Sequence, residues 1–137
     1  MESPTYTISL LYRKIAVLYD GSETSLKALD FAIDLSRHYG SKIVVIHAKP
    51  RGIRGEDSFT KVKERAKRYS VDISYKEVEF DPENSSTASA ILKEIIDGGY
   101  DAVILGARGK SLTADVSIGS KALFIAANSP VSVFIIR

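Results

Sequence analysis

The sequence has 137 residues, of which 45% are apolar and 26% charged, and this is the composition of one ordinary globular domain. Its formal net charge of +2 is too small to indicate a nucleic-acid-binding protein by itself. It contains no cysteine, which excludes disulfides and thiolate metal sites. No apolar run approaches the ~20 residues that span a bilayer, and the first residues lack a basic segment followed by an apolar one. We therefore expect a cytoplasmic protein with neither a membrane segment nor a secretory signal.

The first part of the chain predicts a strand, a helix and a second strand. Lys14–Tyr19 is a short apolar run of β-forming residues, which is typical of a strand buried on both faces. Asp20-Gly21-Ser22 then forms a turn and a helix N-cap. Apolar residues recur at helical spacing from there until Gly40, which stands where a C-cap belongs. Lys42–His47 is the second buried strand.

The middle of the chain predicts a loop, two helices and a less regular strand. Pro50–Gly55 reads as a loop because two glycines and a proline interrupt any regular element. Glu56–Tyr69 carries apolar residues on one face and predicts a helix. Asp72–Phe80 predicts a strand at the edge of the sheet, although its alternation changes phase near Glu77. A helix over Ser85–Asp97 follows.

The last part predicts a strand over Ala102–Leu105, a helix over Gly119–Asn128 and a strand over Val131–Ile136. Five short apolar strands separated by helices imply parallel pairing, because parallel neighbours need a long crossover and a helix supplies it. Each crossover should be right-handed. The predicted fold class is therefore α/β, with one doubly wound domain whose parallel sheet carries helices on both faces.

We assign residues 14–137 to this domain and residues 1–13 to an N-terminal extension. The extension is the poorest fit to the alternating pattern. Within it, Thr7–Tyr12 is compatible with a short edge strand, an arm onto a partner subunit or a frayed tail.

Two segments are placed to form a ligand site. In an open α/β sheet, ligands bind beyond the carboxyl ends of the strands, where the strand order reverses. Asp20-Gly21-Ser22 follows the first strand and Gly106 follows the fourth. If the second and fourth strands lie on opposite sides of the first, the crevice falls between these two segments.

The segment Gly106–Ser120 has the chemistry of an anion site. Its glycines let the backbone approach a phosphate closely, and the helix that starts at its end offers free N–H groups and a positive dipole. Arg108 and Lys110 add cations at the rim. The segment is not a P-loop, because Ile104 stands where that motif requires glycine, and it is not the dinucleotide fingerprint.

The order of glycine, two residues, glycine, nine residues, glycine and serine resembles the ATP-binding motif of the universal stress protein family. The likeness covers nearly the whole chain from Lys14, and the segments Lys14–Ser25, Ile43–Ala48 with its His47, and Ser129–Val131 are also similar to that family. The resemblance implies a Rossmann-like sheet of five parallel strands in the order 3-2-1-4-5. It further implies a homodimer joined along the C-terminal strand Val131–Ile136, and a stress-response regulator or sensor that binds ATP with Mg²⁺.

Carried over by position, the resemblance implies a cofactor-binding set at the carboxyl ends of the strands and in the segments that follow them. This set is Leu18, Tyr19, Asp20, Ala48, Leu105, Gly106, Gly109, Gly119, Ser120, Lys121 and Ala122. Asp20 would meet the adenine, and the helix start at Gly119 would hold the phosphates. Many ATP-binding members have a small apolar residue where this chain has Lys121, whose side chain could add a phosphate contact or point to solvent.

Several of these residues also have a simpler explanation. Gly106 could be only a turn residue, and Asp20 only the N-cap of the first helix. His47 is better explained as a packed strand residue than as a ligand or base. The basic cluster within Lys61–Arg68 is most simply the solvated face of an amphipathic helix, so we do not expect nucleic acid as a partner.

No catalytic residue is assigned. No Ser-His-Asp set or carboxylate pair can be assembled, and no metal site made of protein ligands is visible. Asp115 could assist a metal or a water, but a loop aspartate is usually just solvated. We expect a protein that binds ATP and hydrolyses it slowly or not at all. The alternatives are an ATP-using enzyme of phosphoryl or adenylyl transfer, and a stress protein that does not bind nucleotide.

Overall fold

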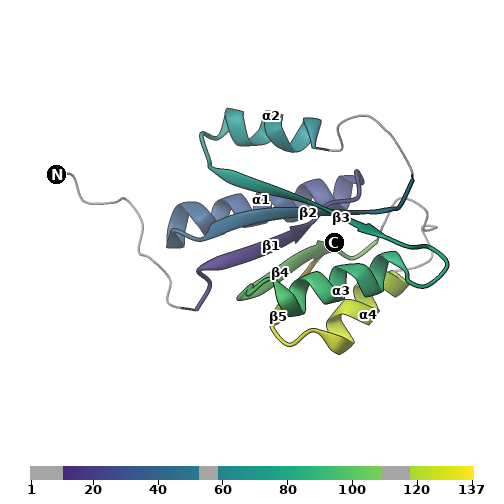
Figure 1. The fold of residues 1–137 in the computed structure, drawn as a ribbon. Coiled ribbons are helices and arrows are strands. Elements are labelled where there is room, and N and C mark those ends of the chain that lie inside the picture. The colour runs from purple at the N-terminus through teal and green to yellow at the C-terminus, as the bar shows by residue number, and fades with distance from the viewer. Residues whose placement is uncertain (1–10, 53–58, 109–117) are drawn as a thin grey trace.

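A five-stranded parallel sheet in the order β3-β2-β1-β4-β5 forms the centre of the computed structural model, which describes residues 11–52, 59–108 and 118–137 (Figure 1). The strands are β1 (Lys14–Leu18), β2 (Lys42–Pro50), β3 (Ile73–Phe80), β4 (Ala102–Gly106) and β5 (Ser132–Ile136). The helices are α1 (Glu23–Tyr39), α2 (Thr60–Arg68), α3 (Thr87–Asp97) and α4 (Ser120–Asn128). The predicted fold class and strand order are confirmed.

The central strand is β1, which pairs with β2 on one side and with β4 on the other. Val17, for example, lies opposite Val45 of β2 and opposite Ile104 of β4. Since β1 has neighbours on both edges and helices over both faces, its residues from Ile15 to Leu18 are at most 3% exposed. A continuous apolar run is the sequence pattern that such a position requires.

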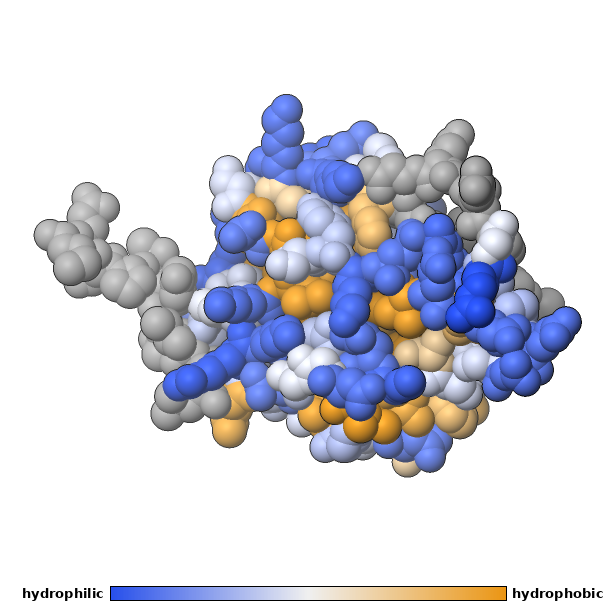
Figure 2. Space-filling view, in the orientation of Figure 1, coloured by the Kyte–Doolittle hydropathy of each residue, from blue (hydrophilic) through white to orange (hydrophobic). Residues whose placement is uncertain are grey.

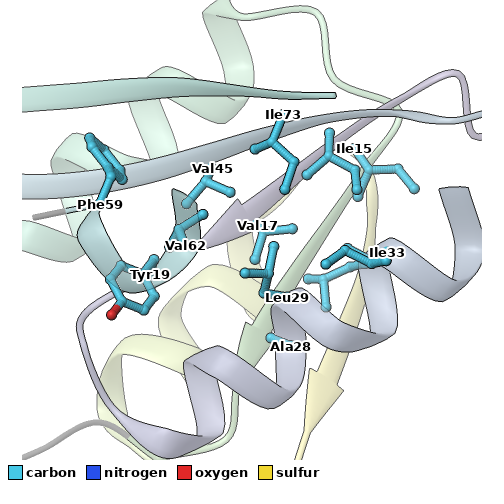
Figure 3. Packing of buried hydrophobic residues seen from close by; sticks show 13 residues of the cluster. Ile15, Val17, Tyr19, Ala28, Leu29, Ile33, Val45, Phe59, Val62 and Ile73 are labelled. Carbon is cyan, nitrogen blue, oxygen red and sulfur yellow. The ribbon is translucent and has the colours of Figure 1, made fainter. Parts of the chain in front are cut away.

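The helices cover the two faces of the sheet in pairs. Alternate residues of β1 separate the core into two clusters, with Ile15 and Val17 in the first and Ala16 and Leu18 in the second. The first cluster includes residues of α1 and α2 and is drawn in Figure 3. The second cluster lies under α3 and α4, which sit together on one side of the sheet in Figure 1. The sheet is therefore doubly wound, as predicted.

The predicted caps of α1 are both present. The Ser22 hydroxyl accepts a hydrogen bond from the backbone N–H of Ser25 at 3.2 Å. At the other end Gly40 has a φ of 70° and donates its N–H to the carbonyl of Ser36 at 2.8 Å. This left-handed conformation is the one that favours glycine at a helix C-terminus.

β2 and β3 differ from the strands predicted for these segments. β2 continues to Pro50, past the expected end at His47, because β3 pairs with it along that whole length. The change of phase in β3 reflects a change in the buried face: Tyr75 packs against the cluster of α1 and α2, whereas Val78 packs against the cluster of α3 and α4. α2 begins at Thr60 rather than at the predicted Glu56. The remaining boundaries shift by one or two residues, as helix and strand ends commonly do.

Some of the predicted segments extend outside the described residues. These are residues 56–58 of the predicted helix Glu56–Tyr69, residues 53–55 of the loop Pro50–Gly55 and residues 7–10 of the segment Thr7–Tyr12. Tyr12 itself packs its ring edge-on against Phe134 of β5, with 5.8 Å between the ring centroids.

The face of the molecule seen in Figure 2 is mostly hydrophilic, with apolar surface over α3 and α4. Ile96, Leu123 and Phe124 on these helices are 57%, 53% and 37% exposed. Among the helices of the described part of the chain, none combines the length and the apolar character needed to cross a membrane.

Candidate functional site

The carboxyl ends of β1 and β4 open onto a small hollow. The chain leaves β1 toward β2 and leaves β4 toward β5, so the two connections run in opposite directions from neighbouring strands. This is the switch point anticipated between Asp20 and Gly106, and the required strand order is confirmed. The lining residues come from both strand ends and the two following helices: Leu18, Asp20, Ser22, Ser25, Leu105, Gly106, Arg108 and Lys121.

Asp20 is held on one wall of the hollow. Its Oδ1 accepts a hydrogen bond from the backbone N–H of Ser22 at 2.9 Å, and its Oδ2 lies 3.6 Å from the Lys121 ammonium. Burial alone would raise the pKa of this carboxyl, but the bonds from Ser22, the charge of Lys121 and a bond from Ser25 outweigh it and lower the pKa. Asp20 is therefore an ionised carboxylate paired with a cation across the hollow.

The opposite wall is the start of α4. Gly119 occupies the N-cap, where no side chain accepts from the first-turn amides. Its own N–H donates to the carbonyl of Ala107 at 2.6 Å, and Ala122, 2% exposed, anchors the first turn in the core. First-turn amides have no acceptor within their helix, so this end of α4 is suited to an anion.

Gly106 has a structural reason to be glycine. A Cβ at this position would lie 2.5 Å from the hydroxyl and 2.8 Å from the Cβ of Thr24 in α1. The Thr24 hydroxyl in turn donates to the carbonyl of Arg108. The end of β4 thus packs directly on the first turn of α1, and Gly106 would be needed there even without a ligand.

The other residues of the implied binding set are divided between the hollow and its surroundings. Leu18 and Leu105 line the hollow, whereas Tyr19 and Ala48 do not. The Tyr19 side chain lies in the cluster of α1 and α2, as Figure 3 shows, and Ala48 packs against the other cluster. Gly109 lies outside the described residues. The roles of these residues toward a nucleotide stay predictions.

The nucleotide-binding role of the helix start also stays a prediction. Ser120 is exposed at the first position of α4, beside Lys121. Lys110 and Asp115, the other charged residues named in the glycine segment, also lie outside the described residues.

Sequence reasoning missed two hydroxyl residues. It treats Ser22 only as an N-cap and overlooks Ser25, yet both line the hollow. Ser25 also donates its hydroxyl to the carbonyl of Ser22 at 2.8 Å. The available signal was the pair of hydroxyl residues following Asp20 at a predicted strand end.

A larger hollow of about 280 Å³ lies between α1 and α2, away from the strand ends. It is lined by Asp30, Phe31, Ile33, Asp34, Arg37 and Tyr69. Asp30 is already paired with Arg65. The hollow at the carboxyl edge holds only about 10 Å³ but brings together an ionised carboxylate, two cationic side chains and a helix N-terminus. We take this hollow as the candidate site because of these charged groups, although its volume is smaller.

No cluster of three His, Asp or Glu side chains able to hold a metal is found in residues 11–52, 59–108 and 118–137.

His47 is half-buried and does not line the hollow. Its ring contacts the ring of Phe59 in a T-shaped arrangement, with 6.2 Å between the ring centroids. Its Nδ1 is buried, lies 3.7 Å from a carboxylate oxygen of Glu77 and makes no hydrogen bond within the described structure. Burial lowers the pKa of His47, and the charge of Glu77 only partly opposes that effect. This agrees with the expected role as a packed strand residue.

Substituting Gly106→Ala should destabilise the protein by about 1–3 kcal/mol, because the new methyl group overpacks the contact with Thr24. Urea unfolding of the variant measures the loss. Ser74→Ala, at an exposed position of β3, serves as the control and should change little. An unaltered unfolding free energy in Gly106→Ala would contradict the packing role.

Substituting His47→Gln should weaken the dependence of stability on pH. A histidine whose pKa is lowered by folding binds protons more readily when unfolded, so it reduces stability as the pH falls below its ordinary value of about 6.5. Urea unfolding at pH 5, 6 and 7 should therefore show a smaller loss at low pH in the variant. His38→Gln, with a side chain 70% exposed, is the matched control. Identical pH profiles for wild type and His47→Gln would refute this assignment.

Known proteins similar to this chain in sequence or structure include several universal stress proteins. Universal stress protein MJ0531 of Methanocaldococcus jannaschii is 23% identical over 146 residues, covering 93% of this chain and 83% of the relative. The structure of universal stress protein UspA from Lactobacillus plantarum superposes with a TM-score of 0.73 at 15% identity, over 94% of this chain and 100% of the other. A universal stress protein in complex with cAMP gives a TM-score of 0.70 at 22% identity, over 93% of this chain and 98% of the other.

At these identities, the likeness to solved structures concerns the fold. The family is established by its sequence model, which matches residues 11–137 and so covers the sheet, all four helices of the described structure and the candidate site. The chain belongs to the universal stress protein family.

Proposed function

We propose that this universal stress protein binds ATP between β1, β4 and the start of α4, and acts as a nucleotide-dependent sensor or regulator in the stress response. The observation that carries the proposal is the convergence of Asp20 and the uncapped start of α4 on one hollow at the switch point of the sheet. Such a crevice is where open α/β sheets bind their ligands.

The phosphate end would lie at α4. The amides of Ser120, Lys121 and Ala122 belong to the first turn, for which Gly119 supplies no side-chain cap. Their dipole favours negative charge, and the cations of Lys121 and Arg108 line the same hollow. Mg²⁺ would accompany ATP and be held mainly by phosphates and water, as is common for this ion. A cluster of protein carboxylates is not needed for it.

The adenine end would lie at β1. Asp20 offers a carboxylate acceptor, while Leu18 and Leu105 offer apolar surface beside it. The complex of a relative with cAMP supports an adenine nucleotide as the ligand class. In our proposal Tyr19 and Ala48 act through their backbone, because neither side chain lines the hollow. Gly109 would lie beside the ribose and phosphates.

Binding rather than catalysis is the proposed activity. Phosphoryl transfer needs a residue that positions the attacking group as well as cations that stabilise the transition state. The hollow supplies cations, but among the described residues its carboxylate is Asp20, which the proposal places at the adenine end and away from the phosphates.

We also propose a homodimer joined along β5. Because β5 is an edge strand, it offers backbone groups to a second strand, and its residues from Val133 to Ile136 are only partly buried.

A stress protein that does not bind nucleotide is the second candidate. The small volume of the hollow and the ion pair across it favour this alternative. Measuring whether the protein holds ATP separates this candidate from the ATP-binding protein.

ATP should copurify with the protein or bind to it on titration. Mass spectrometry of nucleotide released after purification without added ligand, together with calorimetric titration, measures this. Gly119→Val should abolish binding, because a β-branched side chain at the N-cap would stand in the way of the phosphates. Ser74→Val, at an exposed position of β3, introduces the same side chain outside the site and is the control.

Absence of nucleotide in both measurements, with no effect of ATP on the melting temperature of the wild type or of Gly119→Val, would make the non-binding alternative correct.

Hydrolysis should be slow. We expect fewer than about one turnover per second, which is the low end of ordinary enzyme rates. Phosphate release from ATP and Mg²⁺ under steady-state conditions tests this. Faster turnover that disappears in Gly119→Val would favour an ATP-using enzyme over a binding protein.

A further inference from the structure

The ion pair between Lys121 and Asp20 spans the hollow in which the nucleotide would bind. It joins the two walls, one carried by the turn after β1 and the other by the first turn of α4. The volume of the hollow, about 10 Å³, is room for about one water molecule. A nucleotide needs more room than this, and Lys121 is one of the side chains that bound the space.

We propose that Lys121 is a specificity-determining residue that exchanges partners, leaving Asp20 for the phosphates of the ligand while Asp20 accepts a donor from the base or ribose. The inference rests on the proposed nucleotide site and adds the class of ligand that it selects. The ligand must carry an anionic group and an N–H or O–H donor in one molecule.

The position of Lys121 supports the exchange. It is the second residue of α4, and a cation in the first turn of a helix is disfavoured by the helix dipole. An anion beside the ammonium group offsets this effect. In the structure that anion is Asp20, and the phosphates of a nucleotide are a stronger one located at the same helix end.

The length of the ion pair also supports the exchange. Its nitrogen and oxygen are 3.6 Å apart, beyond hydrogen-bond distance, and the two side chains are 30% and 28% exposed. Partly exposed pairs of this kind contribute little to stability. Breaking the contact therefore requires little, and the flexible stem of lysine can turn toward a new partner.

The exchange changes the surroundings of Asp20. Once Lys121 has moved, Oδ1 keeps its bond from Ser22, but Oδ2 has lost its cation. A phosphate without a base takes the cation from Asp20 and offers no donor in return, and a nucleoside without phosphates has to displace Lys121 without offering it an anion. A ligand with both groups should therefore bind more tightly than either part alone.

Calorimetry with three probes tests this selectivity. ATP carries both groups, adenosine only the base and ribose, and tripolyphosphate only the anion. Lys121→Met keeps the aliphatic stem and removes the charge, and Lys121→Arg restores a cation. Lys42→Met removes a charge from an exposed lysine at the amino end of β2 and is the matched control.

Wild type should bind ATP more tightly than either partial ligand. In Lys121→Met the ratio of ATP affinity to adenosine affinity should fall by at least about tenfold, because a charge-assisted bond is lost and the obstruction to adenosine is removed. Lys121→Arg should retain most of the ratio, and Lys42→Met should leave it unchanged. An equal ratio in wild type and Lys121→Met would overturn the exchange while leaving the nucleotide site intact.

A measurement without ligand tests the ion pair itself. Carbon-13 NMR titration of the Asp20 carboxyl should give a higher pKa in Lys121→Met than in wild type, because the nearby cation lowers it. An unchanged pKa would overturn the proposal.

The remaining outcomes are also decisive. If Lys121→Met binds ATP and wild type does not, Lys121 is a permanent block rather than an exchanging residue. If neither protein binds any nucleotide, the proposed function fails together with this inference.

Discussion

The pairing of β1 with a parallel neighbour on each side is the constraint on which the rest of the structure depends. It buries both faces and both edges of one strand, so α1 and α2 must cover one side of the sheet and α3 and α4 the other. It also makes the chain leave β1 and β4 in opposite directions. The hollow at their carboxyl ends follows from this topology, and the distant segments that line it meet for the same reason.

The residues of the hollow differ in how well the fold alone explains them. Gly106 is required by the contact with Thr24, and Asp20 forms a turn with Ser22 that leads into α1. Lys121 has no comparable structural reason, because the dipole of α4 disfavours a cation at that place. In our proposal it pairs with Asp20 in the free protein and with the phosphates of the ligand in the complex.

The fold could be predicted from the sequence because β1, β4 and the inward face of α1 each carry an apolar pattern that matches the burial of the element. The caps at Ser22 and Gly40 are likewise local and were predictable. The site was only partly predictable. Its place at the switch point follows from the strand order, but the contact of Gly106 with Thr24 and the reach of Lys121 to Asp20 depend on how α1 and α4 pack across the sheet. No local pattern encodes those distances.

Amide NMR during an ATP titration tests most directly whether the ligand binds at the carboxyl edge of β1 and β4. The largest shifts should occur at Asp20, Gly106, Ser120 and Lys121, around one hollow. Residues such as Phe31 and Tyr69, which line the larger hollow between α1 and α2, should stay unchanged. Shifts concentrated around Phe31 and Tyr69, or no shifts at saturating ATP, would contradict it.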